Sequence, residues 1–120
     1  MRFIKYFVVS ILMLYAFWAQ ADTLLKFGVY TADKPSAVVR QFRPLLNVIE
    51  SEMSQRLGEQ VKIKMQVTKT YEKGIQDIVK GNVDFSRFGP ASYITASRQN
   101  PKLTILAMES KKGKKRFNGV

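Results

Sequence analysis

The chain has 120 residues, contains neither cysteine nor histidine, and carries 20 Lys and Arg against 9 Asp and Glu, a formal net charge of +11 at pH 7. The missing residue types exclude disulfides, thiolate nucleophiles, Ser-His triads and zinc sites built from Cys or His. The positive charge favours anionic partners, namely nucleic acid, anionic lipid or anionic solutes. The length allows one small domain, or part of a larger one.

Residues 1–21 predict a secretory signal peptide. A short basic leader precedes an apolar run over residues 6–19, and Ala19-Gln20-Ala21 forms a small-x-small cleavage site. We therefore expect cleavage after this site and a domain over residues 22–120. The alternative is an uncleaved membrane anchor, although the apolar run is short for crossing a bilayer. An exported protein seldom meets nucleic acid, so no nucleic-acid partner is expected.

A strand and a long helix are predicted first. Leu24 to Tyr30 is a mostly apolar run bounded by polar residues, as in a strand buried on both faces. Apolar residues then recur every three or four positions as far as Leu57, which predicts an amphipathic helix that Gly58 ends. Pro44 lies inside this pattern and lacks a backbone donor. Either the helix kinks there or a short first turn stops before it.

The next two elements are predicted to be an edge strand and a shorter helix. Val61 to Val67 alternates apolar with polar residues, so one face of this strand is wet. Lysines on that face suit a sheet edge, where they discourage pairing with another chain. Tyr71 to Lys80 has apolar residues on one helical face, and Gly81 follows as a stop.

The remaining chain continues to alternate between strand and helix. We expect a strand over Val83 to Phe88, a helix over Pro90 to Gln99, a strand over Leu103 to Met108 and the start of another at Phe117 to Val120. Alternation of this kind predicts an α/β fold with a mostly parallel sheet flanked by helices on both faces.

The segment Phe88-Gly89-Pro90-Ala91-Ser92-Tyr93 joins a strand to a helix and is the most informative part of the sequence. Ligands of such sheets bind beyond the carboxyl ends of the strands, where the strand order reverses. Gly89 allows a tight turn, and Pro90 fits the first helical position. The next backbone donors then point outward, and with a serine hydroxyl and a phenol nearby they suit a phosphoryl or phosphonyl anion. A purely structural Gly-Pro turn is the alternative.

Three further residues complete the predicted ligand site. Thr70 is a plausible cap for the preceding helix, and Tyr71 opens that helix. Tyr30 ends the first strand. The alternatives are a cap without a ligand and ordinary core tyrosines with satisfied hydroxyls.

The sequence does not favour an enzyme. Asp77 is expected to lie mid-helix in solvent, and Asp84 to bond neighbouring backbone. With Asp33 and Glu72, these are the carboxylates to consider for acid–base catalysis, and helical spacing brings no pair of them together near the predicted cleft. We therefore expect no catalytic residue, no metal and no cofactor.

Several short motifs follow one known family in order: Leu25 to Tyr30, Asp33-Lys34-Pro35-Ser36, Phe42 to Leu46, Tyr71-Glu72-Lys73-Gly74-Ile75 and Gly81 to Tyr93. The chain resembles the phosphate, phosphite and phosphonate substrate-binding proteins of ABC transporters, which have the type II periplasmic-binding-protein fold. The resemblance covers nearly all of residues 24–120.

This resemblance implies a two-lobed periplasmic protein that closes on a small oxyanion (phosphonate, phosphite or phosphate) and delivers it to an ABC transporter permease in the inner membrane. It places Tyr71, the Phe88–Tyr93 turn and Phe117 in the pocket, where Phe117 lacks the hydroxyl that relatives can offer. Family members continue into a second lobe beyond Val120. We therefore expect a partial first lobe, an amino-terminal fragment that binds methylphosphonate or phosphate weakly or not at all.

Two other functions remain as alternatives. The same module can serve as the extracytoplasmic sensor of a histidine kinase or a diguanylate cyclase, in which case a transmembrane helix follows the domain. A basic binder of nucleic acid or lipid rests on charge alone and predicts a steep loss of binding with salt.

Overall fold

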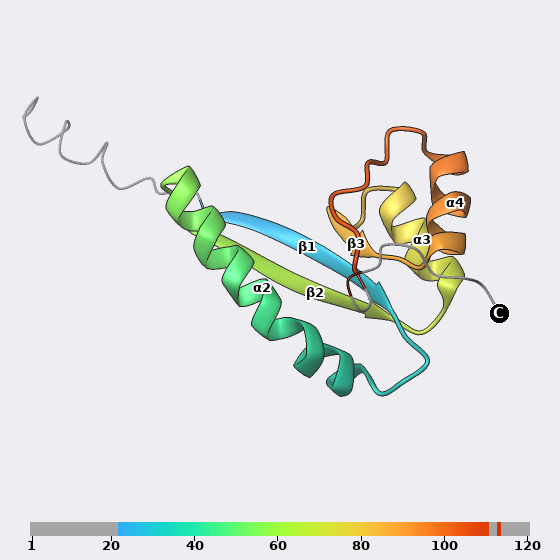
Figure 1. Cartoon of the computed structure of the whole chain (residues 1–120), viewed down its shortest axis with the longest axis horizontal. Coiled ribbons are helices and arrows are strands. Elements are labelled where there is room, and N and C mark those ends of the chain that lie inside the picture. Colours follow the sequence, from blue (N-terminus) through green and yellow to red (C-terminus); the bar gives the residue numbers. More distant parts are fainter. Residues whose placement is uncertain (1–21, 111–112, 114–120) are drawn as a thin grey trace, which may run out of the picture.

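The computed structural model describes residues 22–110 and residue 113. Along the chain these form β1 (Thr23–Tyr30), α2 (Pro35–Leu57), β2 (Val61–Thr68), α3 (Tyr71–Val79), β3 (Phe85–Arg87) and α4 (Pro90–Gln99) (Figure 1). The predicted signal peptide and the predicted strand over residues 117–120 lie outside the described residues.

The three strands form one parallel sheet in the order β2-β1-β3. The register pairs Thr23 with Val61 and Phe27 with Phe85, so the first strand along the chain lies in the centre. The α/β class, the parallel sheet and the edge position of β2 were predicted from the alternating pattern and are confirmed. β3 is shorter than its predicted range.

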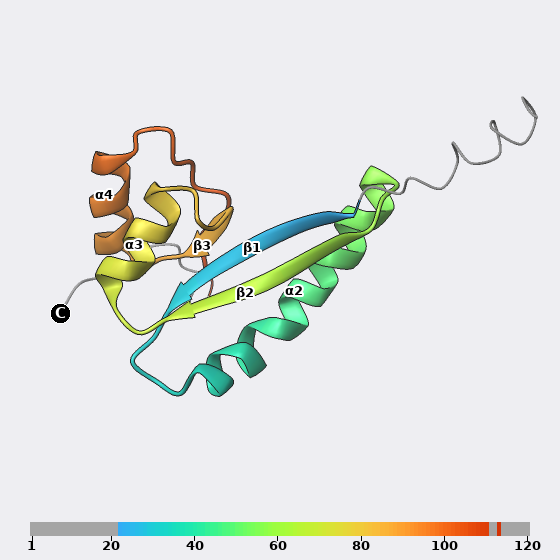
Figure 2. The same ribbon diagram turned by 180° about the vertical axis from the view of Figure 1, so that it is seen from behind.

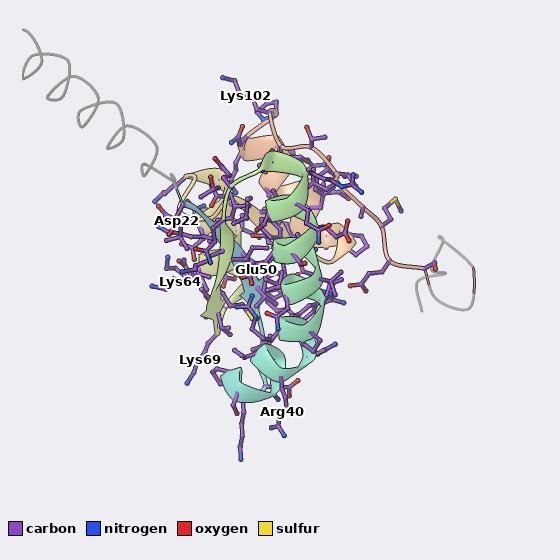
Figure 3. All side chains as sticks on the ribbon, turned by 90° about the vertical axis from the view of Figure 1, so that its left-hand side faces the viewer. Asp22, Arg40, Glu50, Lys64, Lys69 and Lys102 are labelled. Atoms are coloured by element: carbon purple, nitrogen blue, oxygen red, sulfur yellow. The ribbon has the colours of Figure 1, made fainter. Side chains whose placement is uncertain are left out.

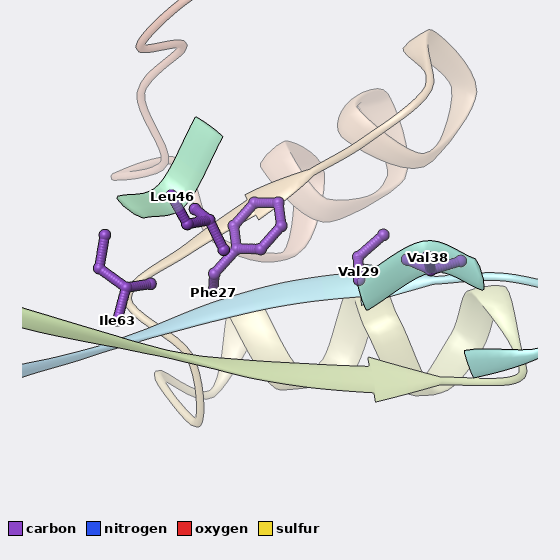
Figure 4. Packing of buried hydrophobic residues seen from close by; sticks show 5 residues of the cluster. All are labelled: Phe27, Val29, Val38, Leu46 and Ile63. Carbon is purple, nitrogen blue, oxygen red and sulfur yellow. The ribbon is translucent and has the colours of Figure 1, made fainter. Parts of the chain in front are cut away.

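Helix α2 covers one whole face of the sheet and forms the core with it (Figures 1 and 4). The odd-numbered residues of β1 and β2 point toward this helix, because successive side chains of a strand alternate between faces. Phe27, Val29 and Ile63 from the strands and Val38 and Leu46 from the helix are all buried in one cluster. The three-to-four spacing thus places the apolar stripe of α2 on the sheet.

Pro44 does not interrupt α2, which runs as one helix from Pro35 to Leu57. The question that the sequence left open is therefore decided in favour of a continuous helix through the proline. The predicted stop is confirmed: Gly58 has a φ of 68°, in the left-handed region, and its N–H donates to the carbonyl of Ser54. A residue without Cβ adopts this conformation at little cost.

Side chains of α2 also cover the free edge of β2. Glu50 accepts hydrogen bonds from the Ile63 backbone N–H at 2.6 Å and from Arg43 at 2.8 Å, and Arg43 donates to the Ile63 carbonyl at 2.9 Å. Lys64 is exposed on the other face of the same strand, and in Figure 3 it projects into solvent. The edge strand is thus blocked by bonded side chains as well as by the predicted lysines.

Helices α3 and α4 pack side by side on the opposite face, at the carboxyl end of the sheet (Figure 2). There Gly28 of β1 faces Ser86 of β3, and a Cβ at Gly28 would come within 2.5 Å of the Ser86 Oγ. This glycine is therefore needed for the close approach of β3 and the turn before it. Asp84 bonds the Lys26 backbone N–H at 2.7 Å, as predicted.

The prediction that Asp77 lies in solvent is wrong. Its side chain is 1% exposed, and its carboxylate accepts hydrogen bonds from Gln66 at 2.7 Å, from Asn82 at 3.2 Å and from Lys73. Burial raises the pKa of this carboxyl. The hydrogen bonds from Lys73, Asn82 and Gln66 together lower the pKa by more than burial raises it, so the pKa lies below its ordinary value. Asp77 therefore ties α3 to β2 and to the turn after the helix.

The predicted strand over Leu103 to Met108 is also wrong, because this segment has no strand conformation. Ile105, Leu106 and Met108 are 50%, 80% and 60% exposed. An apolar run becomes a strand only where a neighbouring strand accepts its backbone bonds, and this segment pairs with none of the described strands. A bidentate ion pair between Arg87 and Glu109, at 2.8 and 3.2 Å, joins the end of this segment to β3.

Within residues 22–110, no helix combines the length and the apolar character needed to cross a membrane.

Candidate functional site

The carboxyl ends of the three strands meet at one edge of the sheet, as they must in a parallel arrangement. From the central strand β1 the chain turns to α2 on one face. From β3 it turns to α4 on the other face. The order therefore reverses between Tyr30 and Phe88, which is where ligands of such sheets bind.

Tyr30 is the residue on which this site is built. Its hydroxyl accepts a hydrogen bond from the Gly89 N–H at 3.0 Å and bonds the Ser92 Oγ at 3.0 Å. Its ring lies against two other aromatic rings, with centroids 4.6 Å away for Tyr71 and 5.8 Å away for Phe88. One side chain thus contacts the amino ends of both α3 and α4.

Gly74 makes room for the Tyr30 ring. A Cβ at Gly74 would lie 2.8 Å from the Tyr30 Cδ1, closer than real side chains approach. The glycine lies inside α3, where it lowers helix propensity, and the sequence pattern gave no reason for it. The reason is the packing of α3 against the aromatic end of β1.

The amino terminus of α4 carries no side-chain cap. Gly89 is the N-cap residue, Pro90 follows in the first turn, and no acidic residue is present there. The Tyr93 N–H bonds the Gly89 carbonyl at 3.1 Å, which starts the helical ladder. The backbone N–H groups of Ala91 and Ser92 precede that first bond, and a helix dipole adds partial positive charge to such groups.

The amino terminus of α3 is different, because it has a side-chain cap and an acidic residue in its first turn. The Thr70 hydroxyl accepts the Lys73 N–H at 3.2 Å, and Glu72 places a negative charge in the first turn. The prediction that Thr70 caps α3 is confirmed. Of α3 and α4, only α4 begins without a side-chain cap and without an acidic residue in its first turn, and α2 also begins without either, on the other face.

The structure brings nine of the ten predicted site residues to this edge of the sheet: Tyr30, Thr70, Tyr71, Phe88, Gly89, Pro90, Ala91, Ser92 and Tyr93. Phe117 lies outside the described residues. Tyr71 is 63% exposed, so the described part of the site is an open face. Whether any of these residues contacts a ligand stays a prediction.

The sequence pointed to the range Thr68 to Tyr71 at this edge, but Thr68 was not among the predicted site residues. The Thr68 Oγ1, at the end of β2, is buried and has no hydrogen-bond partner within the described residues. Buried hydroxyls are normally bonded, so this one is a candidate donor. Its only sequence signal was its place before the Thr70–Tyr71 helix start.

Two cations near this edge, Arg87 and Lys73, are bonded to carboxylates. The hydrogen bond that Arg87 donates to Glu109 raises the pKa of the Arg87 guanidinium, which also stacks over the Phe42 ring at 5.8 Å on the α2 face. Lys73 is bonded to Asp77. No cluster of three or more His, Cys, Asp or Glu suited to a metal occurs in residues 22–110. Backbone N–H groups at the start of α4 add positive charge to this edge.

A family model described as ABC transporter, phosphonate, periplasmic substrate-binding protein matches residues 27–120. The chain belongs to this phosphonate-binding family. The match spans most of the sequence and begins within β1, so it includes all ten predicted site residues. It confirms the family resemblance seen in the short motifs. Comparisons with curated proteins and with solved structures found no match.

Membership in the phosphonate-binding family fixes the class of the protein. The family consists of substrate-binding proteins, which is not a class of enzyme, and its members act outside the cytoplasm as parts of ABC transporters. The parallel three-stranded sheet flanked by helices agrees with part of a periplasmic-binding-protein fold.

Proposed function

We propose that this chain is the extracytoplasmic solute-binding component of an ABC importer and binds a phosphonate, phosphite or phosphate at the amino terminus of α4. One observation carries the proposal: this helix end has no side-chain cap and lies beside Tyr30, where the strand order reverses. The family match to phosphonate-binding proteins supports the same ligand class.

The chemistry of the site suits an oxyanion. Deprotonated phosphonyl oxygens accept hydrogen bonds and cannot donate them. The first turn of α4 offers them backbone N–H donors at the positive end of a helix dipole. No carboxylate in that turn competes for these donors. The exposed Tyr71 ring beside them offers apolar surface for the organic substituent of a phosphonate.

The proposed partner is a permease in the inner membrane, with the protein in the periplasm after export by residues 1–21. The alternative sensor role, as the input domain of a histidine kinase or a diguanylate cyclase, has no observation in its favour beyond the shared module.

The proposal is tested by titrating the ¹⁵N-labelled chain with methylphosphonate and following its backbone amide signals by NMR, which reports weak as well as tight binding. We expect the largest shifts at Ala91, Ser92 and Tyr93, because their N–H groups meet the anion. Shifts that spread over the lysines instead, or no shifts at all, would show that α4 is not the site.

A matched set of variants separates the helix end from general charge effects. Gly89→Asp places a carboxylate at the N-cap, where its Cβ meets nothing closer than the Tyr30 hydroxyl at 3.6 Å, so it should cap the helix and abolish the shifts. Gln99→Glu adds the same charge at the other end of α4 and should leave them. If both variants lose the amide shifts equally, the effect comes from net charge and not from the helix end.

A further inference from the structure

The sheet face opposite α2 is covered over only part of its length. Helices α3 and α4 lie at its carboxyl end, where Gln66 of β2 bonds Asp77 of α3, and the amino halves of β1 and β2 carry a helix on the α2 side alone (Figures 1 and 2). Even-numbered residues of both strands point away from α2. Four such residues of the open half are exposed and form what we call the basic face: Leu24, Lys26, Lys62 and Lys64.

The lysines of the basic face are arranged so that they repel one another. The parallel register places Lys26 opposite Lys64, and Lys62 is the next residue of β2 on the same face. Like charges at opposed positions of neighbouring strands destabilise a sheet. None of the ion pairs within residues 22–110 involves these three lysines. The repulsion is therefore not relieved by an ion pair in the described part of the chain.

The carboxylates of the chain leave this positive charge in excess. All nine Asp and Glu residues lie between residues 22 and 109, and four of them pair with other cations: Glu50, Glu52, Asp77 and Glu109. Asp84 adjoins the basic face, but its carboxylate accepts from the backbone N–H of Lys26 and not from a lysine ammonium group. Asp22 is the other carboxylate at this end of β1. An external anion can therefore supply what the chain does not.

We propose that the basic face is a docking surface for a membrane of anionic phospholipid. The ammonium groups meet the phosphate headgroups, and this contact relieves the repulsion between Lys26 and Lys64. Leu24, which is 59% exposed beside them, enters the boundary between headgroups and acyl chains together with the methylene stems of the lysines. Each lysine close to an anionic bilayer strengthens binding about fivefold.

Two features favour a membrane over an acidic protein or a nucleic acid. The basic face begins at Leu24, directly after the predicted leader over residues 1–21, and such a leader brings this end of the chain to a membrane during export. An exposed leucine among the lysines adds nothing to a contact with nucleic-acid phosphates, but it suits a bilayer interface. The inference does not depend on the proposed function, because the candidate site lies at the other end of β1, around Tyr30.

Lysine acetylation, followed at each site by mass spectrometry, tests the proposal on the exported chain that begins at Asp22. Vesicles of phosphatidylcholine with about 30% phosphatidylglycerol should protect the three lysines of the basic face, because an anionic surface holds them. Lys69 and Lys102 are exposed elsewhere and should stay reactive. Vesicles of phosphatidylcholine alone should protect none of these lysines.

A matched pair of variants separates the basic face from net charge. Lys64→Gln should weaken cosedimentation with the anionic vesicles about fivefold, whereas Lys69→Gln, with the same change of charge at an exposed position after β2, should weaken it less than about twofold. Without vesicles, Lys64→Glu should raise the urea concentration at the unfolding midpoint, because it turns the repulsive pair with Lys26 into an attractive one. The same variant should bind the anionic vesicles more weakly than Lys64→Gln.

Three results would overturn the inference. Protection confined to the lysines of residues 111–116 would place lipid binding on that basic run of the sequence. Protection of the basic face by polyglutamate and not by anionic vesicles would assign the face to an acidic protein. Equal losses in Lys64→Gln and Lys69→Gln would mean that the vesicles respond to total charge and not to this face.

Discussion

The two faces of the sheet are held by different forces. On the α2 face, Phe27, Ile63 and Leu46 are buried in an apolar cluster. These side chains carry no polar group that needs a hydrogen-bond partner. On the α3 and α4 face, the buried side chains include the Asp77 carboxylate and the Ser92 hydroxyl, and each is fixed by hydrogen bonds. The α2 face is held mainly by apolar packing, and the other face combines buried apolar side chains such as Ile75 and Val83 with a polar network at the candidate site.

This difference teaches where the molecule can tolerate change. Apolar packing is non-directional, so its loss lowers the free energy of unfolding by an amount that depends on the volume removed. A polar network fixes angles, so its loss displaces particular groups as well. Substitutions on the α2 face should therefore affect stability, and substitutions on the other face should also affect the geometry around Tyr30.

The largest expected effect is in the apolar face. Leu46→Ala should lower the free energy of unfolding by about 3 kcal/mol, because Leu46 is 1% exposed and its loss leaves a cavity. The neighbouring Leu45 is 57% exposed, so Leu45→Ala should change stability by less than about 1 kcal/mol. Urea unfolding of the two variants measures the difference, and equal effects would mean that the core is not where we place it.

A somewhat smaller loss is expected in the polar network. Asp77→Ala should lower the free energy of unfolding by about 2 kcal/mol, because it removes the acceptor of Gln66 and Asn82. The exposed Glu52 offers a matched control, since its pair with Arg56 lies in solvent and Glu52→Ala should cost at most about 0.5 kcal/mol.

The same carboxylate predicts a pH dependence. The pKa of Asp77 is lower in the folded protein than its ordinary value, so its contribution to stability is complete above the ordinary value, about 4. That contribution is lost as the pH falls through the folded pKa. The difference in unfolding free energy between wild type and Asp77→Asn should therefore shrink below about pH 4. A difference that stays constant with pH would mean that the charge of Asp77 does not matter.

The smallest expected effect tests the contact between α3 and Tyr30. Glycine to alanine inside a helix normally stabilises by up to about 1 kcal/mol, but here the new Cβ collides with the Tyr30 ring. Gly74→Ala should therefore destabilise by about 1 kcal/mol and shift the amide signals of Gly89 and Ser92. A Tyr30→Ala background removes the contact with Cδ1 at 2.8 Å and leaves that with the Cβ at 3.2 Å, so the same change should destabilise less there.

Much of the fold could be predicted from local patterns, because each pattern reports burial on one element. The alternation over Val61 to Val67 located the edge strand, and the three-to-four spacing with Gly58 located α2 and its end. The strand over Leu103 to Met108 was wrongly predicted for the same reason, since an apolar run says nothing of whether a neighbouring strand exists. Pro44 was undecidable because a helix can continue through a proline when packing holds it.

The candidate site was predictable in its location and less so in its bonds. Topology alone places Tyr30, Thr70 and the Phe88–Tyr93 turn at one edge, because parallel strands end together. The bond between Tyr30 and Ser92, 62 positions apart, depends on the tertiary packing of α4. Asp77 was misjudged in the same way, because helical periodicity marks a charged residue as solvated unless another element brings partners to it.

The central position of β1 has a consequence for the order of assembly. Its partners lie far ahead in the sequence, since Thr23 pairs with Val61 and Phe27 with Phe85. During synthesis the first strand made must therefore wait, without a neighbour on one side, until residue 85 has emerged. Such non-local pairing is slow because the entropy cost of closing a long loop precedes the stabilising contacts. A chain that ends before residue 85 lacks the partner of β1 on that side, so its central strand stays half-paired.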